Sequence, residues 1–146
     1  MAGHKDLFTG EVVEYAMGDR LTKNLVSQSL FHVVSTKRLA ADLTHHSDRG
    51  SQYCSKEYRK LLEQFKMETS MSRRGRCYDN APIESFWGML KNELVHHRRY
   101  ATRQEAMREI MEYIEIFYNR QRCQKRLSYL SPAAYNRKYF KKLRAA

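Results

Sequence analysis

Apolar and polar residues follow two patterns along the chain, one typical of strands and one typical of helices. Short apolar runs on either side of Thr9-Gly10 predict two strands, at residues 6–8 and 11–17, joined by a tight turn. Helical spacing then predicts a helix over about 22–36, with an apolar face of Leu25, Val26, Leu30, Val33 and Val34. The chain therefore opens as strand, turn, strand and helix.

The next segment predicts a strand, a helix and a second strand. A short strand over 43–46 leads to Asp48, and Gly50 supplies the turn that follows. Ser55 is a suitable N-cap for a helix whose inner face is Tyr58, Leu61, Leu62 and Phe65. Residues 67–71 alternate in the manner of a strand, and the polar residues 72–80 predict a loop.

Helices dominate the second half of the chain. Asp79 or Asn80 can cap a helix with Pro82 in its first turn and an apolar face of Ile83, Phe86, Trp87, Leu90 and Leu94. A Thr102-x-x-Glu105 capping box opens a long helix that predicts an inner face of Met107, Ile110, Met111, Ile114, Phe117 and Tyr118. Ser131-Pro132 begins a last short helix. No Pro/Gly-rich linker divides the chain, so the pattern predicts one mixed α/β domain.

Length and composition are those of a globular protein. The 146 residues are 42% hydrophobic and 12% aromatic, enough for one domain with a real core. No apolar run reaches the length of a membrane span, so we expect no membrane association. The three cysteines are odd in number and form no Cys-x-x-Cys pair, which disfavours a disulfide framework and indicates a reducing, cytoplasmic location.

The net charge of +11 is concentrated at one end of the chain. Residues 1–95 carry 14 Lys and Arg against 12 Asp and Glu, whereas residues 96–146 carry 13 against 4. A basic surface beside a near-neutral core favours nucleic acid as partner, through neutralisation of phosphates. A solvated helix face that confers solubility explains the charge equally well.

Two carboxylates and one lysine are candidates for chemistry. Asp48 follows a predicted strand, where open α/β sheets place their ligands, and Glu84 lies 35 residues further on in the first turns of a predicted helix. Lys91 follows Glu84 by seven residues, close to two helical turns, so the two share a face. Taken singly, Asp48 is more typical of an ordinary turn aspartate and Glu84 of a glutamate near a helix N-terminus. Lys91 taken singly is more typical of a solvated lysine.

The sequence motifs around these residues resemble those of one known family. They are His46-Ser-Asp-Arg-Gly-Ser51, Ser70-Met-Ser-Arg-Arg-Gly75, Tyr78-Asp-Asn-Ala-Pro-Ile-Glu84, Leu90-Lys-Asn-Glu-Leu94, Tyr118-Asn119 and Leu130-Ser-Pro-Ala-Ala-Tyr135. In this order and spacing they are similar to the catalytic core of bacterial insertion-sequence transposases, members of the DDE transposase and retroviral integrase superfamily. The resemblance covers nearly the whole chain. It implies a ribonuclease H-like fold, a mixed sheet flanked by helices.

The resemblance also implies a chemistry. In that family the residues matching Asp48 and Glu84 bind Mg²⁺ or Mn²⁺, and the residue matching Lys91 contacts DNA at the transposon end. Two metal ions can activate an attacking oxygen and stabilise a leaving one. The implied function is therefore metal-dependent cleavage and strand transfer at the ends of a mobile element. The implied protein is a homo-oligomer when complete, located in the bacterial cytoplasm at the nucleoid.

The sequence departs from the family pattern at its start. The family's first strand and first catalytic aspartate precede the segment matching residues 6–8, so both are expected to be absent, as is an upstream helix-turn-helix region. We expect residues 1–146 to be a partial integrase core, with a core remnant over about 1–100 and a basic helical C-terminal extension over about 101–146. Cys123 and Ser128 stand where the family usually has histidine and glycine.

These departures leave three functions open. The chain is the core portion of a DNA strand-transfer enzyme, a DNA-binding remnant of a transposase without catalysis, or a general basic module that binds RNA. Whether this chain alone is an enzyme stays open for the same reason. Transposition by this chain alone is disfavoured, because two carboxylates hold a metal less well than three.

Basic residues supply candidate DNA contacts in two places. Arg73, Arg74 and Arg76 lie in the loop before the Glu84 helix, where the implied fold places them beside the acidic residues. A second patch consists of Arg120, Arg122, Lys125 and Arg126, with Tyr118 and Tyr129 between them; core packing is the favoured role of Tyr118. The basic residues over 137–142 are typical of a nonspecific tail.

Two histidine pairs, at residues 45–46 and 96–97, raise the question of a metal site. Adjacent residues of a strand point to opposite faces of its sheet, so neither pair is a natural chelate. Roles as polar surface groups or hydrogen-bonded histidines are favoured.

Overall fold

The computed structural model describes residues 1–37, 39–40, 42–73 and 77–145. The chain forms two compact units. Unit 1 contains Met1–His4 and Val13–Ser85, and unit 2 contains Lys5–Val12 and Phe86–Ala146. Among the described residues no helix is long and apolar enough to span a membrane.

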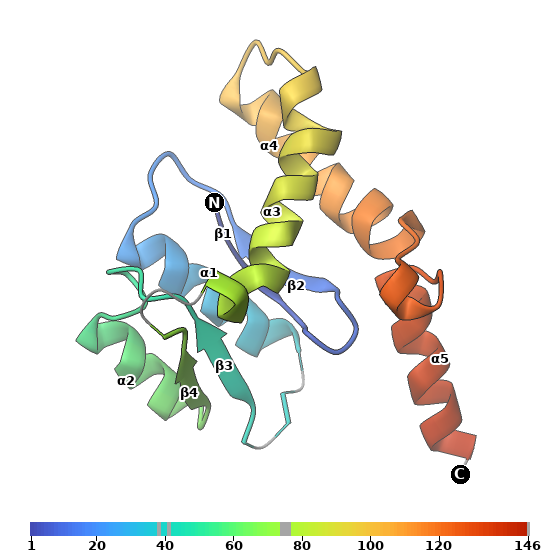
Figure 1. The fold of residues 1–146 in the computed structure, drawn as a ribbon. Coiled ribbons are helices and arrows are strands. Elements are labelled where there is room, and N and C mark those ends of the chain that lie inside the picture. Colours follow the sequence, from blue (N-terminus) through green and yellow to red (C-terminus); the bar gives the residue numbers. More distant parts are fainter. Residues whose placement is uncertain (38, 41, 74–76, 146) are drawn as a thin grey trace. The chain divides into compact units, whose positions relative to one another are not determined.

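Among the residues that the structure describes, four short strands form two two-stranded sheets (Figure 1). Strands β1 (Ala2–Lys5) and β2 (Val12–Ala16) form one sheet. The other pairs β3 (Thr44–Ser47) in parallel with β4 (Glu68–Met71), with Thr44 opposite Glu68 and Ser47 opposite Met71. The mixed α/β architecture is confirmed, but within the described residues the strands pair two by two and not in one sheet.

The first strand lies earlier in the chain than its apolar run suggests. The carboxylate of Asp6 accepts hydrogen bonds from the backbone N–H groups of Phe8 (2.9 Å) and Thr9 (3.3 Å), which closes a turn instead of extending a strand. Gly10 completes the turn with φ +77°. The predicted strand at 6–8 is therefore wrong, since the aspartate side chain competes with strand pairing there.

The two predicted helices of unit 1 are confirmed, and each begins after a hydroxyl N-cap, of which Ser55 was predicted. Helix α1 (Lys23–Thr36) follows Thr22, whose hydroxyl accepts from the N–H of Leu25, and α2 (Lys56–Gln64) follows Ser55, which accepts from Tyr58. The apolar faces of these helices meet residues of the strands in one core. Its buried members are Ala2, Ala16, Leu25, Val26, Leu30, Tyr58, Leu62 and Met67.

Unit 2 is mostly helical. The 3₁₀ turn η1 (Cys77–Asn80), still in unit 1, leads into α3 (Ala81–Glu93), which belongs to unit 2 from Phe86 onward. The 3₁₀ turn η2 (Val95–His97) follows α3. Helix α4 (Arg103–Glu112) continues as a π-helix, η3 (Tyr113–Gln121), and a 3₁₀ turn η4 (Lys125–Leu127) precedes α5 (Pro132–Ala145). The basic residues over 137–142 belong to α5, the last helix, which was predicted to begin at Ser131-Pro132.

The predicted capping box before α4 is confirmed. Thr102 Oγ1 accepts a hydrogen bond from the N–H of Glu105 (3.1 Å), and the Glu105 carboxylate accepts one from the N–H of Ala101 (2.8 Å). The predicted inner face of the long helix is correct for Ile114 and Tyr118, which are fully buried. It is wrong for Met107, Met111 and Phe117, which are exposed large hydrophobic residues.

Candidate metal and DNA-binding site

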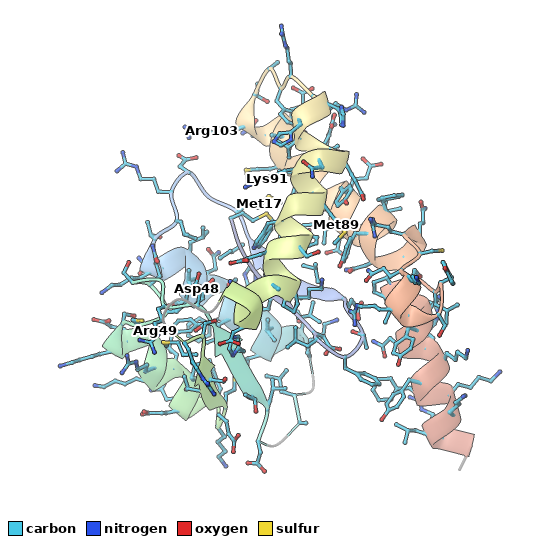
Figure 2. All side chains as sticks on the ribbon, in the orientation of Figure 1. Met17, Asp48, Arg49, Met89, Lys91 and Arg103 are labelled. Carbon is cyan, nitrogen blue, oxygen red and sulfur yellow. The ribbon has the colours of Figure 1, made fainter. Side chains whose placement is uncertain are left out.

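Asp48 is the first residue after β3. Its Oδ1 accepts a hydrogen bond from the backbone N–H of Gly50 (2.8 Å), and a Cβ at Gly50 would lie 2.9 Å from that oxygen. Glycine at this position therefore lets the turn close tightly around the carboxylate. The rest of the Asp48 side chain is exposed, and Figure 2 shows it projecting from the segment that follows β3. Burial raises the pKa of the Tyr53 hydroxyl, and the negative charge of Asp48 raises it further.

The carboxyl ends of β3 and β4 are joined by polar contacts. His46 hydrogen-bonds with the hydroxyls of Ser70 (2.9 Å) and Ser72 (3.1 Å), and Arg49 Nε donates to the carbonyl of Ser72 (2.8 Å). A cavity of about 490 Å³ opens here, lined by His46, Ser70, Met71, Arg73 and Asp79. Sequence reasoning gave no role to Arg49, Ser70 or Ser72, although their closeness in sequence to Asp48 and Arg73 was a usable signal.

Glu84 lies in the first turn of α3, within unit 1. Its side chain is exposed, and its Oε1 accepts a hydrogen bond from the Asn80 amide (3.4 Å). The positive end of the helix dipole favours a carboxylate in this turn. Lys91, in the last turn of the same helix, is exposed as well (Figure 2).

The donor chemistry of Asp48 and Glu84 suits a hard divalent ion. Both are carboxylates in unit 1 with exposed side chains, and each has one oxygen for which no hydrogen bond is recorded in the described structure. Mg²⁺ is held in many proteins by one or two carboxylates together with water and substrate oxygens. No group of three or more His, Cys, Asp or Glu side chains in the described residues is arranged to hold a metal. A site here would therefore depend on a pair of carboxylates.

The predicted basic residues near Asp48 are only partly described. Arg73 is exposed and lines the cavity, and its backbone N–H donates to Asp79 Oδ2 (3.1 Å). Arg74 and Arg76 lie outside the described residues. A DNA contact by any of the three stays a prediction.

The predicted basic residues of unit 2 have different surroundings. Arg122 donates to both oxygens of Glu93, at 2.6 to 3.0 Å, and this pairing holds the pKa of the Glu93 carboxyl below its usual range. Arg126 Nη1 donates to the carbonyl of Leu7 (3.3 Å), whereas Lys125 is exposed. Arg122 and Arg126 thus have contacts within unit 2, and DNA contacts by Arg122, Lys125 and Arg126 stay predictions.

The adjacent histidines of β3 have separate partners. His45 Nε2 hydrogen-bonds with the Tyr58 hydroxyl (3.1 Å), while His46 contacts the serines after and within β4. The interpretation of this pair as hydrogen-bonded histidines is confirmed.

Comparison with known proteins gives matches along most of the chain. Two family models, both described as integrase core domain, match residues 2–77 and 84–140. The chain is 58% identical over 139 residues to an uncharacterised 31 kDa protein of insertion element IS600 from Shigella sonnei, covering 95% of this chain and 51% of that protein. It is 39% identical to the transposase of insertion sequence IS904 from Lactococcus lactis, covering 90% and 52%. The chain thus spans about half the length of these relatives.

Solved structures show the same fold at low sequence identity. A simian T-cell lymphotropic virus intasome in complex with PP2A regulatory subunit B56 gamma matches with a TM-score of 0.67 at 17% identity, over 90% of this chain and 46% of that one. The HTLV-2 integrase catalytic core domain in complex with magnesium matches with a TM-score of 0.62 at 15% identity, over 90% and 79%. The predicted ribonuclease H-like fold is confirmed.

Proposed function

Since this chain belongs to the integrase core domain family, we propose that it carries part of the machinery that cuts DNA at the ends of a bacterial mobile element and joins those ends to a target. The observation that carries the proposal is the position of two carboxylates in one compact unit. Asp48 directly follows β3 and Glu84 lies in the first turn of α3, and both are exposed.

Asp48 and Glu84 would hold Mg²⁺ or Mn²⁺. A bound divalent ion supplies a Lewis acid that stabilises negative charge on the oxygens of a phosphodiester under attack. The turn at Gly50 holds one Asp48 oxygen in place. The contact from Asn80 orients Glu84 in the same way. Each of the two carboxylates is thus restrained by one local hydrogen bond.

Basic side chains would position the DNA. Arg73 borders the cavity at the carboxyl ends of β3 and β4, and Lys91 is an exposed cation on α3. Contacts from such residues to phosphates fix the register of a strand without reading its sequence. Lys91, Arg73, Arg74, Arg76, Lys125 and Arg126 are the residues proposed for this role. We assign Arg122 a smaller part, because its guanidinium is already paired with Glu93.

The same proposal covers assembly and location. We propose that the protein acts as a homo-oligomer in the bacterial cytoplasm, at the nucleoid where its DNA substrate lies. Support for assembly comes from the solved structures of similar fold, one of which is an intasome and another a dimeric integrase core. Support for the location comes from the bacterial sources of the relatives.

A strand-cutting assay tests the catalytic assignment. The substrate is a labelled duplex carrying the terminal repeat of the element that encodes the chain. Residues 1–146 are assayed within a chain that also carries the first strand and first aspartate of the family pattern, in Mg²⁺, in Mn²⁺ and with chelator. We expect metal-dependent cutting that falls more than about 100-fold in Asp48→Asn and in Glu84→Gln. The size follows because even the outer partners of metal ligands contribute about 10–100-fold.

Glu63→Gln is the matched control, because Glu63 is an exposed helical glutamate of the same unit. It should cut as well as the parent protein. Full activity of Glu84→Gln would contradict the assignment. DNA binding that survives Asp48→Asn, with no cutting in either metal, would instead identify a DNA-binding remnant.

A further inference from the structure

Unit 2 contains a groove between η3 and α5 that the proposed chemistry does not use. Its volume is about 600 Å³. Arg120 of η3 lines one side, and Arg137, Lys141 and Arg144 line the other from a single face of α5. Four cations from two helical segments therefore converge on one groove.

The positive charge of this groove exceeds the negative charge of its lining. From residue 113 to 146 the chain carries nine Lys and Arg but one acid, Glu115. None of the ion pairs found in the described part of the chain includes Arg120, Arg137, Lys141 or Arg144. Arg137 and Lys141 are four residues apart on α5, a spacing at which like charges destabilise a helix. An anion from outside the chain would relieve this repulsion.

One carboxylate also lines the groove. Glu11 Oε2 accepts a hydrogen bond from the amide of Asn136, another lining residue (3.2 Å). Because four cations face this one carboxylate, the lining keeps a net positive charge.

An exposed aromatic ring lies among the cations. Phe140 of α5 lines the groove, and 52% of its surface is exposed. Cations that follow a backbone, interleaved with aromatic rings on which bases stack, are typical of sites for single-stranded nucleic acid. The groove volume lies in the range of about 300–1,000 Å³ that holds small ligands. That range suits a nucleotide unit better than a whole duplex.

We propose that this groove binds an unpaired segment of a DNA strand, with Arg120, Arg137, Lys141 and Arg144 on its phosphates and Phe140 on a base. The choice of DNA over RNA rests on the proposed function in DNA strand transfer. The groove is a second contact surface for the strand, additional to the residues already proposed. DNA binding in the groove gives a role to the α5 cations that line it, Arg137, Lys141 and Arg144.

The test compares two double variants of α5. Arg137→Ala with Lys141→Ala removes two groove cations, whereas Lys138→Ala with Lys142→Ala removes two exposed cations of the same helix that do not line the groove. Binding of the whole chain to a fluorescent 20-nucleotide DNA strand is measured by anisotropy over a series of salt concentrations. Circular dichroism confirms that each variant is folded. A Phe140→Ala variant tests the aromatic contact.

We expect the groove variant to bind at least about tenfold more weakly, with the slope of log K against log salt reduced by about 1.4, since each phosphate contact on a single strand contributes about 0.7. The control should lose less than about threefold. Phe140→Ala should lose about tenfold on the single strand, with little change on a blunt duplex. Equal losses in both double variants would overturn the proposal. So would tighter binding of the same sequence as RNA.

Failure of this proposal is distinguishable from failure of the proposed function. Unchanged binding by the groove variant, combined with loss of cutting in Glu84→Gln, would overturn the groove alone. Specific loss of DNA binding in the groove variant, combined with no metal-dependent cutting by the parent, would support the groove and contradict the strand-transfer function.

Discussion

Asn119 joins two segments of unit 2 by pairing its side-chain amide with the backbone of one distant residue. Its Oδ1 accepts from the N–H of Val12 (3.0 Å) and its Nδ2 donates to the carbonyl of Val12 (2.9 Å). The neighbouring Tyr118 hydroxyl donates to the carbonyl of Gly10 (3.3 Å). Asn119 and Val12 are both buried, so these groups have no water to replace a lost partner.

We therefore expect Asn119→Ala to lower the free energy of unfolding by about 2–3 kcal/mol, because it leaves the N–H and the carbonyl of Val12 buried without partners. Asn92→Ala is the matched control, an exposed asparagine of α3, and should change stability by less than about 0.5 kcal/mol. Urea denaturation followed by circular dichroism measures both. Equal stability of the two variants would show that the Val12 contacts contribute nothing.

The π-helix η3 explains why helical periodicity misplaced Phe117 on the inner face of the long helix. Its hydrogen bonds run from residue i to i+5, so residues five apart lie on one face. Tyr113 with Tyr118, and Ile114 with Asn119, are buried pairs at this spacing. A period of 3.6 instead selects Phe117, which is exposed. A widened helix also lets the neighbouring residues Tyr118 and Asn119 both reach the segment that contains Gly10 and Val12.

Four elements of unit 1 enclose two neutral histidines. His4 of β1 hydrogen-bonds with Ser29 of α1 (3.0 Å), and its ring lies 5.4 Å from that of His45 on β3. His45 in turn contacts Tyr58 of α2. Burial lowers the pKa of His4 to about 3 and that of His45 to about 4, and the proximity of other histidines adds to both shifts. These rings bridge strands and helices only while they are uncharged.

Acid should therefore destabilise unit 1. Both folded-state pKa values lie below the unfolded value of 6.5, so below pH 6.5 the unfolded chain binds protons that the folded chain does not. Stability is fully present above pH 6.5 and is lost as pH falls towards 4, at about 1.4 kcal/mol per pH unit for each histidine. Urea unfolding at pH 7, 6 and 5 measures the slope. His45→Gln should reduce it, whereas His96→Gln, at an exposed position, should not. A free energy of unfolding that does not change between pH 7 and pH 5 would contradict a stabilising role of the two neutral histidines.

The features predicted from sequence are those that depend on neighbouring residues. Ser55 and Thr102 were recognised as caps because the hydroxyl and the amide it binds are three residues apart. The carboxylates Asp48 and Glu84 were recognised from sequence motifs that resemble those of the family. In the structure Asp48 follows a strand and Glu84 lies at the start of a helix, as the local pattern predicts.

The features missed depend on contacts between distant residues. Asn119 binds Val12 across 107 residues, and Arg122 pairs with Glu93 across 29. The groove brings residues of η3 and α5 together with Glu11, so neither charge runs nor periodicity could identify it. The mispredicted strand at 6–8 has a local cause, because Asp6 had to be recognised as a turn-forming side chain.

The central claim is that Asp48 and Glu84 bind one divalent ion together. Manganese titration followed by amide NMR tests it directly, because a bound paramagnetic ion broadens the signals of residues near it. We predict simultaneous broadening of the amides around Asp48 and around Glu84, with the loss of both effects in Asp48→Asn and in Glu84→Gln. Broadening at only one of the two segments, or broadening at Glu84 that persists in Asp48→Asn, would contradict a shared site.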